Sequence, residues 1–559
     1  MTIDSALPKV KKIAIVNPYL IRGQNQISEV EACYRFIDAA KKLGIEVAVF
    51  NRSEEVHAFN PDFIIPITYQ EPKLTEFPTY GLVVVPLNWA TWLPRLMRNI
   101  LTYDAYFTVA PIIKDWLNNI SKVTGKVMHI ENAMFSMSKT AFKPLDLNNA
   151  TAVYMGVNWD GLRHHELFSL LSDGKFLKCY GPKGSWDKYP ASLYGGSVPF
   201  DGFATLDTYA KHGIGLAINH PDADRDGVPA CRIFEIIASS AVAICTDNAY
   251  YKSTLGDAVL YVDKTLSPNN LAEAIKEKVL WVRSHPKEAQ ALAKKAHDIF
   301  LKDLSLESFI EKMVEMHQRV VIENGFRKKT SPVKSPKITY IISVENAQTV
   351  KNIIADIQRQ TYDNVDAILL VENQALEKQL KHYLNDKIHL LHYSGPSSNL
   401  ELFNSLQNHG TEWISVLKND DKLFPNHSAL LMKSYLNSQH DKNNESTVIV
   451  FANSLEHSSS ANLRDKLQDA HMLYSENNVR VGNLSPQGQI PFCAIAIKLT
   501  KSISDTFKSM DFRSNLNINF TVSPSPLELA IPSNEITCSS SVVDPLRGSF
   551  LTIKNMAWV

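Results

Sequence analysis

The densest group of chemically useful side chains lies between His220 and Asp226, in the stretch HPDADRD. Its imidazole and carboxylates follow the apolar run GIGLAIN, which predicts a buried parallel strand. Open parallel sheets bind ligands at the carboxyl ends of their strands, where a carboxylate or an imidazole can take a proton or stabilise a positive charge. His220, Asp224 and Asp226 are therefore candidate catalytic residues; an acidic surface loop is the alternative.

An arginine and a glutamate follow on the next predicted helix, CRIFEIIASS. Arg232 and Glu235 are three residues apart and therefore share one helical face. A guanidinium at the positive end of a helix suits a phosphate or diphosphate. This pattern predicts an anion-binding site. The alternative is an ion pair between the two residues on a solvated helix, which would stabilise the helix by only about a few tenths of a kcal/mol.

The stretch from His220 to Asp263 resembles the nucleotide-sugar site of GT-B fold glycosyltransferases. In that family an acid-Gly-x-Pro loop leads into a helix bearing a second acid, then a small-residue turn and a short strand; the stretch from Asp226 to Pro229, followed by Glu235, keeps this order. The resemblance implies that Glu235 accepts hydrogen bonds from the donor ribose. Asp226 stands where the family usually has Glu, and Ser239-Ser240 replace its usual Cys-Gly turn.

The same resemblance assigns three more donor-binding residues. Gly156 and Arg163, in TAVYMGVNWDGLRHH, match the opening of the family's second lobe, where a strand ends in Gly and an Arg faces the donor phosphates. Gly23 lies in the first-lobe loop NPYLIRGQNQ, where similar enzymes have a flexible Gly loop. A simple turn is the alternative for Gly23, and a solvent-facing charge is the alternative for Arg163.

Repeated strand–helix units must position these residues. Short apolar strands such as IAIVNP and FIIPI alternate with helices, as in a parallel sheet that is buried on both faces. We expect an α/β fold with two Rossmann-like lobes, residues 1–140 on the acceptor side and 141–325 on the donor side. The basic, Pro-bearing stretch at 326–336 predicts a linker to a third α/β domain at 337–559.

The third domain resembles GT-A fold, family-two-type glycosyltransferases. The stretches IQRQTYDNVDAILLVEN and WISVLKNDDKLFP match the order of that family's motifs, in which DxD carboxylates hold a metal on the donor diphosphate. Lys418 occupies the first DxD position, while Asp420 and Asp421 remain. We expect a degraded transferase that serves in docking or acceptor binding; the alternative is activity that depends on Mn²⁺ or Mg²⁺ at Asp420 and Asp421.

Composition excludes several classes of protein. The chain has 58 basic and 58 acidic residues, so no overall charge favours nucleic acid. The sequence contains no run of 18 apolar residues and therefore predicts no membrane-spanning helix. Peripheral association with a membrane is compatible with this sequence. Six scattered cysteines without a CxxC pair indicate reduced thiols and a cytoplasmic protein.

Together these patterns predict a glycosyltransferase that moves a sugar from a nucleotide-sugar donor to a saccharide, lipid-linked or protein acceptor, as in bacterial surface-glycan synthesis. The resemblance implies no metal or other cofactor in the GT-B site. Trp89 and Trp92 either stack a sugar or pack in the core. The alternatives are a non-catalytic carbohydrate- or nucleotide-binding scaffold, catalysis by the third domain, or an epimerase or phosphorylase on the same two-lobed fold.

Overall fold

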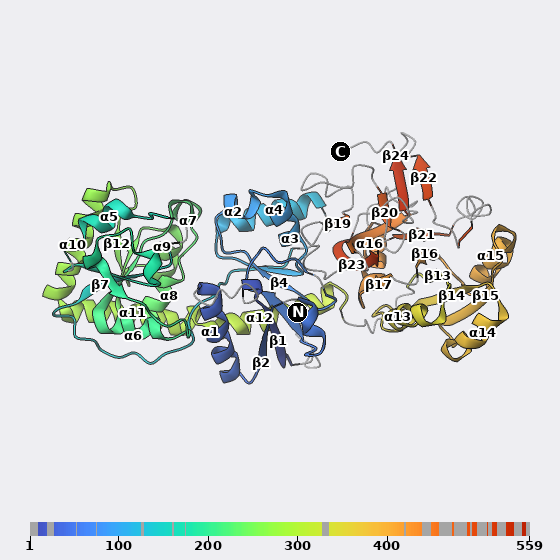
Figure 1. Cartoon of the computed structure of the whole chain (residues 1–559), viewed down its shortest axis with the longest axis horizontal. Coiled ribbons are helices and arrows are strands. Elements are labelled where there is room, and N and C mark those ends of the chain that lie inside the picture. The colour runs from blue at the N-terminus through green and yellow to red at the C-terminus, as the bar shows by residue number, and fades with distance from the viewer. Residues whose placement is uncertain are drawn as a thin grey trace.

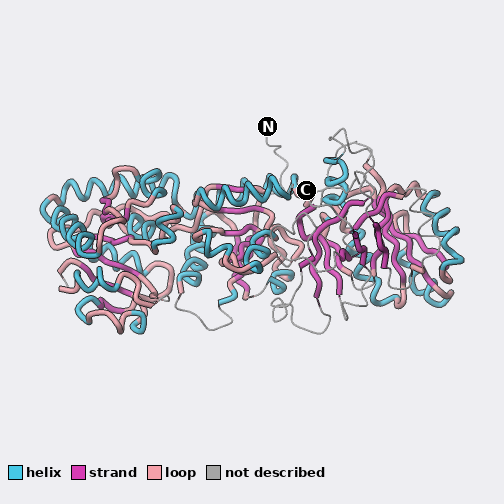
Figure 2. Tube along the Cα trace, turned by 90° about the horizontal axis from the view of Figure 1, so that it is seen from above, coloured by secondary structure: helices cyan, strands magenta, loops and turns pink. Residues whose placement is uncertain are grey.

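The computed structural model describes residues 9–19, 27–51, 53–73, 75–124, 128–158, 161–173, 175–326, 335–418, 421–438, 449–457, 472–473, 489–491, 495–499, 511–512, 517–521, 533–541 and 550–554. The chain forms three α/β bodies that follow one another along the long axis (Figure 1), and the view from above gives the same order (Figure 2). The first lobe lies in the middle, between the second lobe and the third domain.

The first lobe is built on two short parallel sheets, of order β2-β1-β3 and β4-β5-β6, which an isolated parallel bridge between Ile64 and Thr79 connects. Their strands are β1 (Lys12–Val16), β2 (Glu46–Phe50), β3 (Phe63–Pro66), β4 (Tyr80–Leu82), β5 (Ala105–Phe107) and β6 (Ile130–Glu131). The helices are α1 (Ser28–Lys42), η2 (Ser53–His57), α2 (Leu87–Thr91), α3 (Pro94–Leu101) and α4 (Pro111–Thr124).

The second lobe is a six-stranded parallel sheet of order β12-β11-β10-β7-β8-β9. Its strands are β7 (Thr151–Met155), β8 (Leu177–Tyr180), β9 (Tyr194–Gly196), β10 (Gly213–Ala217), β11 (Val242–Thr246) and β12 (Leu260–Val262). The helices are α5 (His165–Leu170), η3 (Lys183–Ser185), η4 (Ala191–Leu193), α6 (Ala204–His212), α7 (Pro221–Asp226), α8 (Arg232–Ala238), α9 (Ala249–Leu255), α10 (Pro268–Ser284) and α11 (Pro286–Ile299). Both Rossmann-like lobes expected from the sequence are present.

A close approach fixes α8 against the sheet of the second lobe. Every residue of β10 is buried, and a Cβ atom on Gly215 in the middle of this strand would lie 2.2 Å from Cγ1 of Ile236 on α8. Only glycine permits this contact without a shift of the helix. Gly215 therefore sets the depth at which α8, which carries Arg232 and Glu235, sits over the carboxyl edge of the sheet.

The last helix of the two-lobed part crosses back to the first lobe. After α11 the chain passes through a π-helical turn, η5 (Phe300–Leu304), into α12 (Leu306–Glu323), which Ser305 caps through its hydroxyl. The buried residues of α12 belong to the core of the first lobe, together with β1, β3 and α1. Residues 306–323 thus follow the second lobe in sequence but pack on the first.

The third domain has a central sheet of order β15-β14-β13-β16-β21-β18-β23-β17, in which β13 to β16 are parallel and β21 is antiparallel. Its strands are β13 (Ile338–Ser343), β14 (Val365–Val371), β15 (Ile388–His392), β16 (Trp413–Leu417), β17 (Lys422–Leu423), β18 (Ile449–His457), β21 (Ile495–Lys498) and β23 (Ser533–Ser541). The helices are α13 (Ala347–Gln358), α14 (Gln374–Leu380), η6 (Lys381–Tyr383), η7 (Pro396–Ser398), α15 (Asn399–Asn408) and α16 (His427–Ser438).

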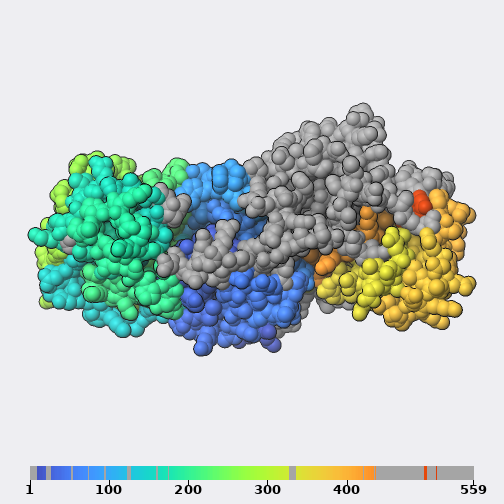
Figure 3. Space-filling view, viewed as in Figure 1, coloured from blue at the N-terminus to red at the C-terminus, as the bar shows by residue number. Residues whose placement is uncertain are grey.

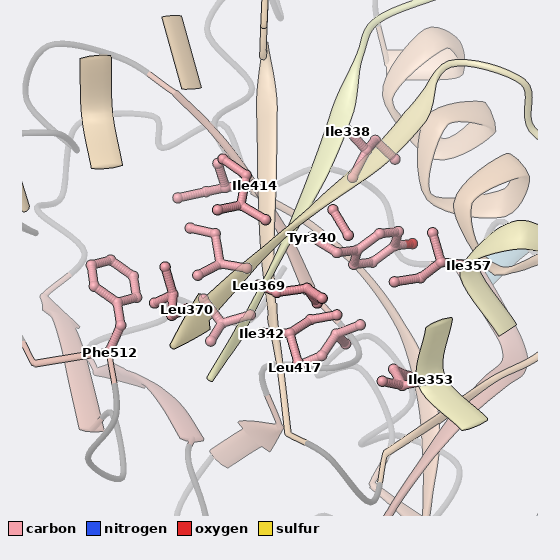
Figure 4. Packing of buried hydrophobic residues seen from close by; sticks show 14 of the residues in the cluster. Ile338, Tyr340, Ile342, Ile353, Ile357, Leu369, Leu370, Ile414, Leu417 and Phe512 are labelled. Carbon is pink, nitrogen blue, oxygen red and sulfur yellow. The ribbon is translucent and has the colours of Figure 1, made fainter. Parts of the chain in front are cut away.

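Apolar side chains from both faces of this sheet fill the core of the third domain, which Figure 4 shows around Tyr340, Leu369 and Leu417. Beyond the central sheet, β19 (Met472–Leu473) pairs with β18, and β20 (Gln489–Pro491), β22 (Asn517–Thr521) and β24 (Phe550–Lys554) form a small separate sheet. Among the described residues, no helix combines the length and the low charge content that crossing a bilayer requires.

Buried polar contacts anchor the third domain to the first lobe. Asn426 donates from Nδ2 to the carbonyl oxygen of Asn324 at 2.9 Å, and Thr361 donates to the carbonyl oxygen of Gly325 at 2.5 Å. Asn324 in turn bonds His129 of the first lobe at 3.1 Å. Because Asn324 and Asn426 are almost fully buried, neither side chain can exchange these partners for water without opening the interface.

A buried ion pair lies at the same interface. The ammonium of Lys73 is 2.9 Å from Asp104, both side chains are 1% exposed, and the ammonium lies 4.8 Å from the ring centre of Phe326 and 5.8 Å from that of Phe424. Lys73 therefore contacts both Phe326, at the start of the predicted linker, and Phe424 of the third domain. A charge removed from such a pair leaves its partner buried and uncompensated.

We predict that Lys73→Met lowers the free energy of unfolding by about 3–5 kcal/mol, because Asp104 is then left in a buried position without its partner. The measurement is urea unfolding followed by intrinsic fluorescence. Lys252→Met is the control: Lys252 and Asp247 pair at 3.0 Å on the surface, where loss of the pair costs about 1 kcal/mol or less. Equal effects of the two substitutions would show that Lys73 is not a structural anchor.

Candidate functional site

The acidic segment that follows β10 forms a short helix, α7; an acidic surface loop was the alternative at this position. His220 precedes it and accepts from the backbone N–H of Asp222 through Nδ1 at 3.2 Å. Pro221 opens the helix with its fixed φ, and Gly227 ends it in the left-handed conformation at φ 71°. A capping group at one end and a glycine at the other thus give α7 its bounds at the carboxyl edge of the sheet.

Two acids of α7 reach across to the first lobe. Asp226 accepts from the backbone N–H of Leu87 at 2.8 Å, and Asp222 accepts from Trp89 Nε1 and Asn88 Nδ2, each at 3.0 Å. Figure 1 shows α7 and α2 facing one another where the two lobes meet. The hydrogen bond from Arg225 and that from Leu87 lower the pKa of Asp226. These carboxylates join the lobes in their ionised form.

The third acid of α7 faces the interior of the second lobe. Asp224 is buried, and its Oδ1 accepts from Asn219 at 2.7 Å and from Thr246 and Asn248 at 3.0 Å each. These donors follow β10 and end or follow β11, so one carboxylate ties the two strand ends together. His220 differs, because its side chain is 30% exposed and its ring meets Trp89 edge to face at 5.2 Å.

Arg232 lies beneath the carboxyl edge, at the start of α8. Its guanidinium covers the ring of Tyr154 at 4.4 Å and donates to the carbonyl oxygens of Met155 at 3.2 Å and Ile218 at 3.0 Å. These oxygens belong to the end of β7 and to the residue after β10. Arg232 therefore holds two neighbouring strand ends and places a positive charge at the edge where ligands of such sheets bind.

Glu235 points from α8 toward the first lobe. Its Oε1 lies 2.8 Å from the guanidinium of Arg35 on α1, and the two side chains are 8% and 6% exposed. Among the described residues, Glu235 and Arg232 form no ion pair with each other, and α8 is buried from Ile233 to Ala238. The alternative of a surface ion pair on a solvated helix therefore does not hold.

Arg35 connects α1 to several other elements of this junction. It donates to the carbonyl oxygen of Gly202 at 2.8 Å and to Thr205 at 3.4 Å, and it lies 3.4 Å from Glu31 on its own helix. Arg35 is not among the residues predicted from the sequence, although the sequence carries a signal for it. Arg35 and Glu31 are four residues apart on the apolar, buried face of α1, where a charged pair needs a partner elsewhere.

The residues assigned to the second-lobe opening lie near the same edge. Gly156 follows β7 directly and donates to Tyr180 at 3.0 Å, and a Cβ on the neighbouring Gly181 would lie 2.2 Å from the Gly156 carbonyl oxygen. Arg163 is half-buried in the turn before α5, which begins at His165. Gly23 lies outside the described residues.

The predicted metal-binding loop of the third domain turns back on itself. Asp421 is buried and accepts from the backbone N–H of Lys418 at 2.8 Å, while Asp420 lies outside the described residues. Asn373, at the end of β14, caps α14 by accepting from Leu376 at 2.9 Å.

Residues 163–315 match a protein-family model described as glycosyl transferase-like. This range holds most of the second lobe, including α7, α8 and Glu235. No curated protein matches the chain.

The chain is also similar to several solved structures. A sucrose-phosphate synthase from Thermosynechococcus elongatus is 12% identical, with 56% of this chain and 100% of that chain covered and a TM-score of 0.40. A glycosyltransferase from Rickettsia africae is 13% identical, with coverage of 56% and 99% and a TM-score of 0.37. S. aureus TarM, in a complex that contains UDP, is 11% identical, with coverage of 47% and 57% and a TM-score of 0.36. Similarity at this level does not bear on substrates or residue roles.

We predict that the junction responds to pH through Glu31. Burial raises its pKa from 4.5 to about 7, Arg35 opposes this rise and Glu235 adds to it. Because the folded state holds this proton more tightly than the unfolded state, the stability it contributes is present below about pH 4.5 and is lost as pH rises through about 7. Glu31→Gln carries no such proton, so it should become more stable than wild type above pH 7, by about 3 kcal/mol at most.

Urea unfolding of both proteins between pH 4.5 and 8.5 measures this difference. Glu46→Gln serves as the control, because Glu46 is an exposed carboxylate of the same lobe. A stability difference between Glu31→Gln and wild type that does not change with pH would contradict the assignment.

Proposed function

We propose that the chain is a glycosyltransferase whose nucleotide-sugar donor binds to the second lobe, at the carboxyl edge of β7 and β10. The observation that carries this proposal is the position of Glu235, a buried carboxylate that lies within the glycosyl transferase-like range and points to the junction of the lobes. A carboxylate offers two oxygens to the paired hydroxyls of a ribose. Glu235 is accordingly our ribose ligand.

The donor diphosphate has a positive environment at this edge. The Arg232 guanidinium is held by strand-end carbonyl oxygens, so its charge acts from a fixed position in surroundings of low dielectric constant. Gly156 lets the backbone approach the ligand, and Arg163, beside α5, supplies a second guanidinium. These residues would offset the negative charge that develops on the departing nucleoside diphosphate, without a metal ion in our proposal.

We propose different roles for the three candidate catalytic residues. His220 accepts through Nδ1 from a backbone N–H, so its neutral ring carries the proton on Nε2 and acts as a donor there. Asp226 and Asp224 each accept several hydrogen bonds, which suits stabilisation of positive charge better than removal of a proton. We propose that this edge stabilises an oxocarbenium-like centre, with His220 donating to an oxygen of the leaving group or of the acceptor.

Closure of the lobes completes the site. Asp222 and Asp226 contact α2 only when the lobes are together, and a closed junction keeps out the water that would otherwise hydrolyse the donor. The third domain, fixed to the first lobe, is proposed to hold the acceptor and not to catalyse transfer itself, because Lys418 replaces a metal-ligand carboxylate.

We predict that one of UDP, GDP, CMP and dTDP, or its sugar conjugate, binds the wild-type protein without added metal, and that Glu235→Ala weakens this binding at least about tenfold. Loss of hydrogen bonds to a charged acceptor costs about 1.5–3 kcal/mol. Arg232→Ala should weaken it as well. The measurement is titration calorimetry, supported by thermal shift, since a specific ligand raises the apparent stability.

The matched control is Glu273→Ala, which removes an exposed glutamate of the same lobe. Glu235→Ala also leaves Arg35 without its partner, which could disturb folding. The double variant Arg35→Met/Glu235→Gln removes both charges and therefore leaves neither one buried alone. If Glu235 binds the nucleotide, the affinity of this double variant for the nucleotide should stay low. A metal-dependent shift that survives both alanine substitutions would place the donor at Asp420, and binding of no nucleotide would favour a non-catalytic scaffold.

Trp92 is the proposed stacking surface for an acceptor sugar. Trp92 caps the carboxyl end of α2 and is 67% exposed. Asn88 and Trp89 lie one turn earlier on the same face of α2 and contact Asp222. A large indole exposed beside polar groups is poorly solvated, and the C–H face of a sugar covers such a ring well.

We predict that Trp92→Ala raises the KM for a saccharide acceptor about three- to tenfold and leaves kcat unchanged, since an aromatic contact is worth about 0.5–1.5 kcal/mol. Steady-state kinetics with the donor identified above measure both constants. Trp92→Phe keeps a ring and should restore most of the affinity. An unchanged KM in Trp92→Ala would exclude this surface as an acceptor contact.

A further inference from the structure

Three side chains with metal-binding atoms converge at the amino edge of the third domain's sheet. Asp366 is the second residue of β14 and His389 the second residue of β15, and the register places both on one face, because Ile368 pairs with His389. His409 follows α15, just before β16 begins at Trp413. Three separate segments of the chain therefore meet at one point.

The spacing of these atoms suits one small cation. The nearest ligand atoms of Asp366, His389 and His409 all lie within 4.8 Å of one another, and His389 Nε2 is 3.7 Å from Asp366 Oδ2. Zinc binds nitrogen and oxygen ligands at about 2.0–2.2 Å, so two ligands of one ion are separated by about 3–4 Å. The two imidazole rings lie 3.9 Å apart between centres, and a small rotation of His409 would close the remaining distance.

One ligand atom has no hydrogen bond of its own. His389 Nε2 is buried and, among the described residues, has no hydrogen-bond partner. A buried nitrogen without a partner is costly, and a bound cation would remove that cost.

A lysine already acts as a cation at this position. The Lys337 ammonium is 2.6 Å from Asp366 Oδ2 and also donates to the carbonyl oxygen of His409 at 2.8 Å. Its side chain is 23% exposed, so it lies at the rim, where it can turn toward solvent. Thr339 meanwhile donates to the other oxygen of Asp366 at 2.5 Å, which fixes the carboxylate as an outer-shell partner would.

We infer that Asp366, His389 and His409 bind a divalent transition-metal ion of the zinc type, which displaces Lys337 from Asp366. Two imidazoles with one carboxylate favour zinc over the hard cations magnesium and calcium. The ion ties the amino ends of β14, β15 and β16 together, and a water molecule fills the fourth position. This site lies at the amino edge of the sheet, opposite the edge that carries Lys418 and Asp421, so it is separate from the proposed transfer reaction.

The test uses the full chain, stripped of metal with a chelator and titrated with Zn²⁺ in a calorimeter and by thermal unfolding. We expect one site per chain and a rise in the unfolding temperature. His389→Ala and His409→Ala should each weaken Zn²⁺ binding more than tenfold and abolish that rise. His392→Ala is the matched control, because His392 lies on the same strand but is exposed and pairs with Glu377.

Lys337→Met gives the sharpest result. If the ammonium competes with the ion, this variant should bind Zn²⁺ more tightly than wild type, by tenfold or more, and should be less stable than wild type only in the absence of metal. Co²⁺ bound to the same protein should show the visible absorption of a four-coordinate ion.

Two results would overturn the inference. One is Zn²⁺ affinity that stays the same in His389→Ala and His409→Ala, which would place binding among the chain's other histidines and cysteines. The other is weaker binding in Lys337→Met, which would mean that Lys337 supports the cluster and does not compete with a cation. Neither result bears on nucleotide binding to the second lobe.

Discussion

The ion pair between Arg35 and Glu235 is the interaction on which the two-lobed part of the molecule depends. It joins α1 of one lobe to α8 of the other in a position closed to water, where a pair survives only if both partners stay in place. The same guanidinium holds the carbonyl oxygen of Gly202. Glu235 is also the proposed ribose ligand, so the relative placement of the lobes and the geometry of the donor site are set by one carboxylate.

Other features support this junction from a distance. Gly215 allows α8 to lie close enough to the sheet for its first turn to reach the lobe boundary, and α7 adds contacts to α2. The first lobe lies between the other two bodies, as the space-filling view in Figure 3 shows. The helix α12 packs on its core, and the third domain is anchored to it through Asn426. The second lobe and the third domain are thus both held by the first lobe.

Most of the fold could be predicted from local patterns in the sequence. The alternation of short apolar strands with helices predicted both lobes, and the acid-Gly-x-Pro order led to Glu235 because the relevant residues are close in sequence. Arg35 could not be paired with Glu235 in this way, because 200 positions separate them and only tertiary packing brings them together. The same reason hid the return of α12, whose amphipathic pattern does not say which core it covers. The bounds of α7, in contrast, could be predicted from the sequence, because Pro221 suits the first position of a helix and Gly227 suits its end.

Hydrogen–deuterium exchange with and without each of these nucleotides tests the central claim, that the donor binds beside Glu235 at the junction of the lobes. The account predicts that one nucleotide, without metal, slows exchange in the peptides that contain residues 151–165 and 213–240, and in α1 around Arg35. Protection confined to residues 365–375 and 413–423 of the third domain would contradict it and would move the donor site to the other sheet.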